Sequence, residues 1–414
     1  MGETVTRHRG FRARLTLTAA QAERLDQQAH AARALWNLLH ELFTVSGARR
    51  PPISYMDAEI RWARANIEWF AVLPAQAAQA VLKAYRQAWV NCWEGKAGRP
   101  AYKSRSRAML AVDIPQGRDL HVMRVHRRWG MVNIPKLGRV RFRWTRELPG
   151  VTKRGPAGRI TGARLIKDAL GWHVVFRTQC DMPLLEGRDW VGSHVGIDRG
   201  IAVPLALSDG TSYTHGPWLN EEEGTRLLHA QQQAARKEQL KQPGQRASKR
   251  LSAVYDQIRH LRARAKRRVL DWQHKATSAI AKDYALVSVE GLDVPGMIRS
   301  ARGTVEMPGV NVAQKSGLNR AIAGEAWGRT VELLTYKLEE QGGFLVRVPA
   351  PGTSLRCSEC GAVTPGSRES QAWFGCRNPQ CGWAGNADFN ASRNIDQAGL
   401  VLASAAGRAV VRQT

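Results

Sequence analysis

The fold can be worked out from residues 357–395, which read Cys357-Ser-Glu-Cys360, fifteen further residues, Cys376-Arg-Asn-Pro-Gln-Cys381, and Gly-Trp-Ala-Gly-Asn-Ala-Asp388-Phe-Asn-Ala-Ser-Arg-Asn-Ile395. Two cysteine pairs at this separation are typical of a closed tetrahedral zinc site, so we expect one structural Zn²⁺ on Cys357, Cys360, Cys376 and Cys381. Four residues separate the second pair, where two is the commoner spacing, and this leaves the local loop geometry open. Four protein ligands leave no vacant coordination position, so we assign the site no catalytic role.

The composition indicates a large and strongly basic protein. Its 414 residues give room for two or three domains. A net charge of +27 and a pI near 10.7 favour a polyanionic partner, with nucleic acid ahead of an anionic membrane surface. The sequence has no long apolar run and no apolar signal-peptide core, so we expect a cytoplasmic protein with no membrane partner. Six cysteines without a secretion signal favour metal binding over disulfides.

The first half of the chain predicts a small β-barrel interrupted by helices. Residues 11–17 alternate apolar and polar side chains, as a half-buried strand does, and residues 106–179 are again strand-like, with Gly and Pro between the strands. Thr18-Ala-Ala-Gln21 is a capping-box pattern that begins a helix. We expect helices over 19–43, 55–67 and 75–93. The predicted barrel therefore comprises residues 1–18 and 106–185, and a helical domain, residues 19–105, is inserted into it.

The second half predicts an α/β layer in which two strands end in carboxylates. Asp198 ends a short apolar strand that begins at Val195, and Glu290 ends a buried strand that begins at Ala285. A basic helical pair lies between them. One helix is expected over 316–340 and one strand over 344–348. We predict an α/β domain made of residues 190–352 and 383–414, with a zinc ribbon, residues 353–382, inserted into it. The whole chain is then a multi-domain α+β protein.

Three carboxylates, Asp198, Glu290 and Asp388, are expected to meet at one edge of this sheet. The ends of neighbouring strands converge there, and the helix after the zinc loop can present Asp388. Carboxylates gathered in one cleft repel each other, and divalent cations provide the counter-charge. We predict two Mg²⁺ ions about 4 Å apart, which would activate a water and stabilise the leaving oxygen in phosphodiester cleavage. Taken alone, Asp198 or Glu290 is as easily an ordinary surface acid.

Basic residues gather in three regions that we predict to contact nucleic acid. Between residues 236 and 268, twelve Lys or Arg stand against two acids, an excess too large for pairing within the helices. A strand near 139–144 carries arginines on one face, and the Gly- and Pro-rich linker near 94–107 carries further cations. The predicted contacts are Arg99, Lys103, Arg105, Arg139, Arg141, Arg143, Arg262, Arg264, Lys266, Arg267 and Arg268. Tyr55, Gln76 and Gln79 are added as candidate base-reading residues, although an exposed helix face explains each of them better.

These segments resemble the TnpB family, whose members are encoded by insertion sequences and are ancestral to compact type V CRISPR effectors. The resemblance rests on Gly196-Ile-Asp198-Arg-Gly, Val289-Glu290-Gly-Leu292, Asn319-Arg-Ala-Ile-Ala-Gly-Glu-Ala-Trp327-Gly, Thr353-Ser-Leu-Arg-Cys-Ser-Glu-Cys360 and Asn386-Ala-Asp388-Phe-Asn390-Ala-Ser-Arg-Asn394-Ile. It is looser in the first half, through Ala34-Leu-Trp-Asn37 and Gly98-Arg-Pro-Ala-Tyr-Lys103.

The resemblance implies an RNA-guided DNA endonuclease with a single RuvC centre. Asp198, Glu290 and Asp388 would be its catalytic acids, within a RuvC (RNase H-like) domain, and the barrel and helical insertion would be the wedge and recognition domains. Its partners would be a guide RNA and double-stranded target DNA with a short adjacent motif, and a monomer is favoured. Gly291 and Ala387 stand where many members carry an acid and an arginine, but neither departure removes a metal ligand.

Two other functions stay open from the sequence. One is a compact type V CRISPR effector or RNA-guided DNA binder that cleaves little, and the other is a basic nucleic-acid-binding protein without a guide. The intact set of three acids favours the nuclease.

Overall fold

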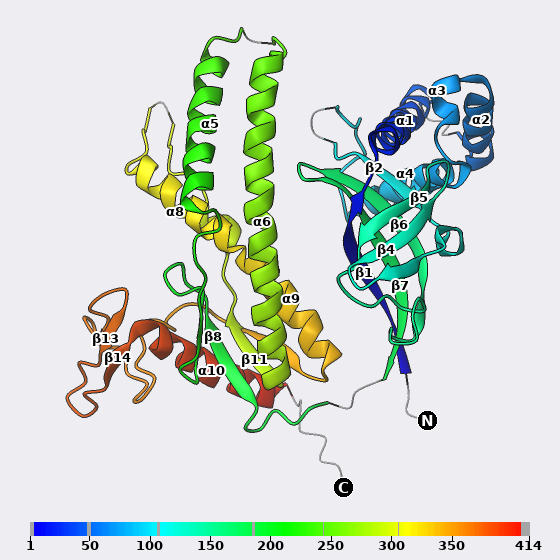
Figure 1. Ribbon diagram of the computed structural model, residues 1–414. Coiled ribbons are helices and arrows are strands. Elements are labelled where there is room, and N and C mark those ends of the chain that lie inside the picture. Colours follow the sequence, from blue (N-terminus) through cyan, green and yellow to red (C-terminus); the bar gives the residue numbers. More distant parts are fainter. Residues whose placement is uncertain are drawn as a thin grey trace. The chain divides into compact units, whose positions relative to one another are not determined.

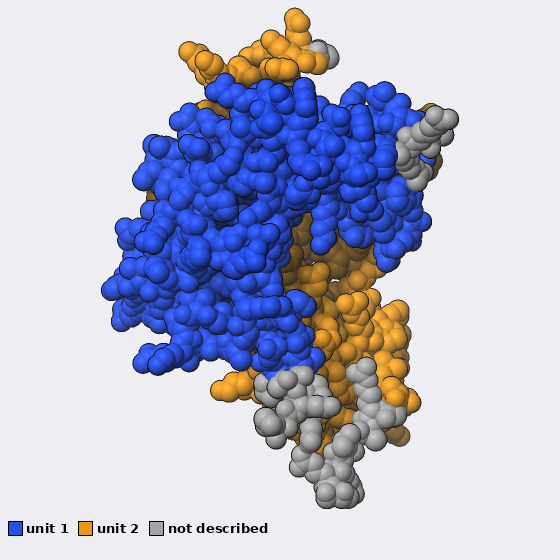
Figure 2. Space-filling model, turned by 90° about the vertical axis from the view of Figure 1, so that its right-hand side faces the viewer, with its two compact units in different colours: residues 1–184 blue, residues 185–414 orange. Residues whose placement is uncertain are grey.

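The computed structural model describes residues 4–47, 51–105, 108–183, 187–242, 244–304 and 306–406. The chain divides into two compact units, Met1–Leu184 (unit 1) and Leu185–Thr414 (unit 2), which Figure 2 shows in different colours. The ends of several predicted domains, among them residues 1, 106, 185 and 414, lie outside the described residues. The finer division into four domains stays a prediction.

Unit 1 is built on a seven-stranded antiparallel sheet (Figure 1). The sheet has the order β2-β6-β7-β1-β5-β4-β3. Its strands are β1 (Thr4–Thr16), β2 (Ala111–Ile114), β3 (Met123–His126), β4 (Trp129–Ile134), β5 (Gly138–Arg143), β6 (Gly158–Asp168) and β7 (Gly171–Pro183). The long strand β1 pairs with β7 from Thr4 to Arg14 and then with β5 at Leu15 and Thr16, so it joins the two halves of the sheet.

Helices inserted between β1 and β2 pack onto this sheet. They are α1 (Ala19–Val45), α2 (Ile53–Asn66), α3 (Glu68–Ala71) and α4 (Ala75–Trp93), and a short 3₁₀ helix, η1 (Gly117–Leu120), follows β2. The expected capping box is present, because the Thr18 hydroxyl accepts from the Gln21 N–H while the Gln21 side chain accepts from the Thr18 N–H. Buried side chains of the helices and of the sheet form one continuous core, so the insertion and the sheet make a single compact unit.

Unit 2 contains a five-stranded mixed sheet with the order β10-β9-β8-β11-β12. Its strands are β8 (His194–Asp198), β9 (Leu205–Leu207), β10 (Ser212–Tyr213), β11 (Leu286–Glu290) and β12 (Phe344–Val348). The three strands β8, β11 and β12 are parallel, while β9 and β10 continue the sheet antiparallel. Parallel strands place their carboxyl ends at one edge, and this edge is where Asp198 and Glu290 were expected.

Helix α10 (Ala387–Ala405) lies close against one face of this sheet. A Cβ atom on Gly196 would lie 2.1 Å from the Ser392 carbonyl oxygen, and one on Gly399 would lie 1.8 Å from Ser288 Oγ. Glycine is therefore needed at both contacts, one on the sheet and one on the helix. The close approach therefore fixes the distance between α10 and the strands β8 and β11.

The opposite face is covered by α6 (Lys249–Asp283) and α9 (Trp327–Glu340), which enclose the apolar core of unit 2. The single helix expected over 316–340 is wrong, because α8 (Val312–Glu325) and α9 are separate helices divided at Ala326. Ala326 has a left-handed backbone (φ 49°), and the Gln273 side-chain amide donates to the carbonyls of Glu325 and Ala326, 3.2 Å each. A side chain of another helix thus bonds to the carbonyls at the break, and the local sequence periodicity does not indicate this contact.

A helical hairpin of α5 (Glu221–Gln239) and α6 extends away from the sheet of unit 2 (Figure 1). Asn220 and Glu223 form a capping box at the start of α5. The Glu223 carboxylate, whose side chain is only 3% exposed, accepts from Arg264 at 2.9 Å and from Arg268 at 2.5 Å. These bonds, that from Arg268 first, lower the pKa of Glu223 to about 2. Two arginines of the basic run, both exposed, therefore pair with a buried acid and hold the two helices together.

No helix in the described part of the chain is long and apolar enough to cross a membrane.

The contact between α10 and the sheet predicts the effect of Gly196→Ala. The new methyl group would meet backbone atoms that cannot rotate away, so we expect a destabilisation of about 1–3 kcal/mol and a lower apparent melting temperature in thermal unfolding. Gly324→Ala is the matched control, because the space around Gly324 in α8 is open and alanine favours a helix. Equal melting temperatures for the two variants would contradict the close contact.

The Glu223 ion pairs predict a pH dependence of stability. The pKa of Glu223 is lower in the folded chain than its ordinary 4.5, so its contribution is complete above pH 4.5 and is lost as pH falls toward 2. The gap in apparent melting temperature between wild type and Glu223→Gln should therefore narrow as the pH falls from 6 to 3. Glu222→Gln, at a 76% exposed neighbour, is the control and should show a small gap at every pH. A Glu223→Gln gap that stays constant would refute the role of these ion pairs.

Candidate active site

Asp198 and Glu290 end two parallel neighbouring strands of unit 2. The register of β8 and β11 pairs Ile197 with Val289, so the two acids follow directly at the next position of each strand. Val195, Ile197, Val287 and Val289 point into the core toward α6 and α9. Side chains alternate along a strand, so Asp198 and Glu290 are on the face that carries α10.

Asp388 comes to the same face because it lies in the first turn of α10. Asn386 caps this helix, with its Oδ1 accepting from the N–H groups of Asp388 (2.9 Å) and Phe389 (3.2 Å). The zinc-loop hairpin of β13 (Trp373–Gly375) and β14 (Ala384–Asn386) runs straight into α10, and the Ala387 N–H donates to the Ala372 carbonyl at 3.0 Å. The hairpin therefore helps to fix the end of the helix that carries Asp388.

The three acids interact electrostatically. Burial, followed by the negative charges of Glu290 and Asp388, raises the pKa of Asp198 to about 7. Burial also raises the pKa of Asp388. Arg368, from the zinc loop, opposes both shifts through its positive charge. A cluster that resists full ionisation in this way favours a divalent cation as counter-charge, and carboxylate oxygens are the ligands that Mg²⁺ prefers.

Two further side chains hold Glu290. The Thr353 hydroxyl donates to Glu290 Oε1, and Arg199, buried next to Asp198, donates to the main-chain carbonyl of Glu290. Thr353 was part of a motif quoted from the sequence and Arg199 directly follows Asp198, but neither was assigned a role. Arg368 was also missed, because nothing in the sequence connects it with residues so far along the chain.

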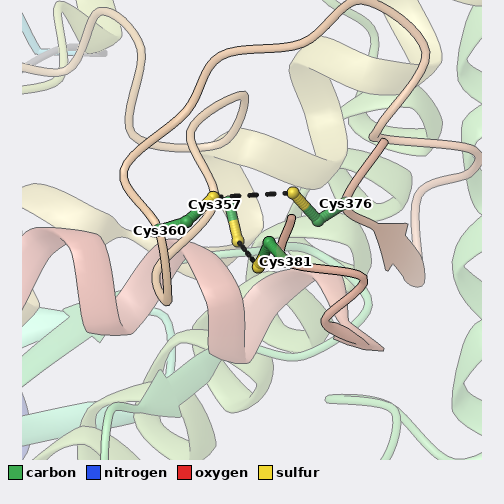
Figure 3. Close-up of side chains that lie close together, drawn as sticks. All are labelled: Cys357, Cys360, Cys376 and Cys381. Atoms are coloured by element: carbon green, nitrogen blue, oxygen red, sulfur yellow. Dashed lines mark hydrogen bonds between the residues drawn. The ribbon is translucent and has the colours of Figure 1, made fainter. Parts of the chain in front are cut away.

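The four cysteines predicted to bind zinc come together in unit 2 (Figure 3). Their sulfur atoms all lie within 4.8 Å of one another, with 3.9 Å from Cys357 to Cys381 and 3.7 Å from Cys360 to Cys376. A tetrahedral site with Zn–S bonds of about 2.3 Å has sulfur atoms about 3.8 Å apart, so the residues fit one Zn²⁺. Among the described residues, the three carboxylates do not form a group this compact.

The predicted nucleic-acid contacts of unit 1 differ in their surroundings. Arg139, Arg141 and Arg143 are exposed on β5, and the guanidinium groups of Arg141 and Arg143 lie over the Trp129 ring at 4.6 and 5.2 Å. Arg99 and Arg105 are exposed. Lys103 Nζ lies 3.5 Å from the centre of the Trp36 ring, and burial lowers its pKa to about 8.

The candidate base-reading residues are mostly engaged within the protein. The Gln76 amide donates to Asp119 at 2.6 Å, and the Gln79 amide donates to Asp57. Tyr55 is 48% exposed on α2. The structure thus uses both glutamines to connect helices to neighbouring segments, although Gln79, like Tyr55, is exposed.

On the hairpin, Arg264 and Arg268 bind Glu223, as described above. Arg262 and Lys266 are exposed on α6, and Arg267 is half-buried. The exposed cations of α6, Arg264 and Arg268 included, therefore keep a basic surface, although the Glu223 carboxylate offsets part of its charge.

Two family models match parts of the chain. The model described as "Probable transposase" (OrfB_IS605) matches residues 186–301, and the model described as "Cas12f1-like, TNB domain" matches residues 327–395. The first covers Asp198 and Glu290, and the second covers the four cysteines and Asp388.

Named relatives are similar over different shares of this chain. A protein of Escherichia coli (strain K12) named "Putative RNA-guided DNA endonuclease InsQ" is 31% identical over 82% of this chain and 78% of its own. A Streptomyces pristinaespiralis protein named "Putative RNA-guided DNA endonuclease" is 25% identical over 96% of this chain and 91% of its own. The CRISPR-associated endodeoxyribonuclease Cas12f1 of Sulfoacidibacillus thermotolerans is 37% identical over 24% of this chain and 22% of its own.

Among solved structures, a Cas12f1–sgRNA–target DNA complex contains a similar chain. The match covers 92% of this chain and 83% of that chain, with a TM-score of 0.55 and 15% identity, and it supports the multi-domain α+β fold. The identity with InsQ over most of both chains establishes the family. The chain belongs to the TnpB family.

Proposed function

We propose that this protein is an RNA-guided DNA endonuclease that cleaves target DNA next to a short adjacent motif by metal-dependent phosphodiester hydrolysis. The observation that carries the proposal is the arrangement of Asp198, Glu290 and Asp388, which β8, β11 and α10 bring to one face of one sheet. Relatives named RNA-guided DNA endonucleases, which match most of this chain, support the same assignment.

Asp198, Glu290 and Asp388 would hold the divalent cations. When bound, two Mg²⁺ ions supply the charge that activates a water and stabilises the leaving oxygen. The oxygen atoms of these three carboxylates do not lie as close together as the ligands of a single ion would. This spacing is compatible with carboxylates that are shared between two ions. Arg368 favours the ionised forms of Asp198 and Asp388 through its charge, and it offers a cation to the phosphate at the same edge.

Zinc would have a structural role. A Zn²⁺ on the four cysteines would fix the β13–β14 hairpin, and through it the start of α10 where Asp388 lies. We further infer that unit 2 is a RuvC-like (RNase H-like) domain with this zinc ribbon inserted, and that the sheet of unit 1 is a wedge-like barrel with its helices as a recognition domain. The exposed cations of β5 and α6 would contact the backbones of guide RNA and target DNA.

The catalytic assignment is tested with the full chain purified together with its RNA. Sequencing that RNA gives the guide, and a plasmid library with the matching target then reports cleavage in Mg²⁺. We expect Asp198→Ala and Asp388→Ala each to lower the cleavage rate by at least about 100-fold while target binding in a gel-shift assay is retained.

Asp271→Ala is the matched control, because Asp271 is 66% exposed on α6 and contacts only the solvent-exposed Lys275 among the pairs described. It should cleave at the wild-type rate. Wild-type cutting by either active-site variant would refute the assignment, and a wild-type protein that binds but never cuts would show an RNA-guided binder instead. A random population of bound RNA would indicate a protein without a guide.

The zinc assignment is tested by elemental analysis of Cys376→Ser. We expect loss of zinc and a lower apparent melting temperature, because metal binding stabilises the fold of the loop. Cys92→Ser is the control, since Cys92 lies on α4 in unit 1, and it should keep the wild-type zinc content. Unchanged zinc in Cys376→Ser would contradict the four-cysteine site.

A further inference from the structure

The segment that joins β12 to the zinc loop contains a hydroxyl group directed at the active site. Thr353 is buried, with 8% of its surface exposed, and its Oγ1 donates to Glu290 Oε1. The same oxygen lies 3.0 Å from the Ala350 carbonyl. A hydroxyl has one proton, and an ionised carboxylate is a stronger acceptor than an amide carbonyl, so the proton belongs on the Glu290 bond.

The backbone of this segment is held by two asparagines of α10. Asn394 Nδ2 donates to the Thr353 carbonyl at 2.8 Å and to the Arg356 carbonyl at 2.7 Å. Asn390, one helical turn earlier, donates to the same Arg356 carbonyl at 2.7 Å and accepts from the Ser358 N–H at 2.8 Å. Both asparagines are buried. The helix that presents Asp388 therefore also fixes the position of the Thr353 hydroxyl.

The Glu290 side chain can still rotate at the end of β11, and the Thr353 hydroxyl can restrict this rotation. Arg199 holds the main-chain carbonyl of Glu290, and the strand pairing holds its backbone. The side chain of Glu290 can still rotate, and Thr353 donates to one of its two carboxylate oxygens. A hydrogen bond to one carboxylate oxygen orients the carboxylate, so that its other oxygen can face the position where a metal ion would bind.

We propose that Thr353 is a positioning residue that orients the Glu290 carboxylate for divalent-metal binding, with Asn390 and Asn394 of α10 holding Thr353 in place. This inference rests on the proposed function, because it concerns the same three-acid site. It adds the Thr353 hydroxyl group to the residues that shape the metal site. It also gives a reason for the threonine four residues before Cys357 and for the two buried asparagines of α10.

The test compares Thr353→Val, which keeps the shape and removes the hydroxyl, with Thr353→Ser, which keeps the hydroxyl. The full chain, zinc-loaded and free of RNA, is titrated with Mn²⁺, and free Mn²⁺ is followed by electron paramagnetic resonance. We expect Mn²⁺ binding to weaken about tenfold in Thr353→Val, the effect typical of losing a hydrogen bond to a metal ligand, and to stay near wild type in Thr353→Ser. The Mg²⁺ concentration for half-maximal cleavage should shift in the same way.

Glu290→Gln separates failure of this inference from failure of the proposed site. Weakened Mn²⁺ binding in Glu290→Gln, with wild-type binding in Thr353→Val, overturns the positioning role and leaves the acid site standing. Wild-type Mn²⁺ binding in Glu290→Gln overturns both. Equal weakening in Thr353→Val and Thr353→Ser indicates a packing role and also overturns the inference. Zinc content and melting temperature are measured for each variant, and Thr353→Ala replaces Thr353→Val if the latter loses zinc.

Discussion

The close contact between α10 and the sheet of unit 2 is the constraint on which the candidate site depends. Gly196 and Gly399 allow the helix to approach until backbone and small side chains touch. At this distance Asp388 reaches the edge where β8 and β11 end, and Asn390 and Asn394 reach the segment that carries Thr353. A helix held further away by one methyl group would lose both sets of contacts. Two glycines at a packing contact thus determine where charged groups lie.

The sequence was sufficient to predict that Asp198 and Glu290 end neighbouring strands and that the four cysteines come together, and the structure shows both. Cysteine pairs at fixed spacing are a pattern that few structures other than metal sites need, whereas the acids were indicated by the ordered set of three and not by any one of them. The contacts of Thr353, Arg199 and Arg368 could not be predicted, because each joins segments far apart in the chain and depends on side-chain direction. The break at Ala326 was missed for the same reason, since Gln273, in another helix, satisfies the carbonyls there.

Only some of the basic side chains of this protein remain available to contact a partner. The sequence count treated every cation of the α5–α6 region alike, but Arg264 and Arg268 are bound to Glu223, a buried acid that lies outside the counted segment. Lys103 is held over Trp36, and two of the β5 arginines lie over Trp129. These contacts order the side chains before any partner arrives, which lowers the entropy lost on binding. Charge counts therefore overestimate the number of free cations while underestimating how well the remaining ones are placed.

The hydrogen bonds of Asn390 and Asn394 with residues 353–358 affect where the chain can vary in length. They close the base of the zinc loop on α10, and β14 closes its other end, so the residues between form a module with both ends anchored. We therefore expect length changes between Cys360 and Cys376 to be absorbed mainly within the module. Arg368 and Ala372 limit this freedom, because the charge of Arg368 acts on Asp198 and Asp388 and the Ala372 carbonyl accepts from the Ala387 N–H, so a loop of another length must keep these two contacts.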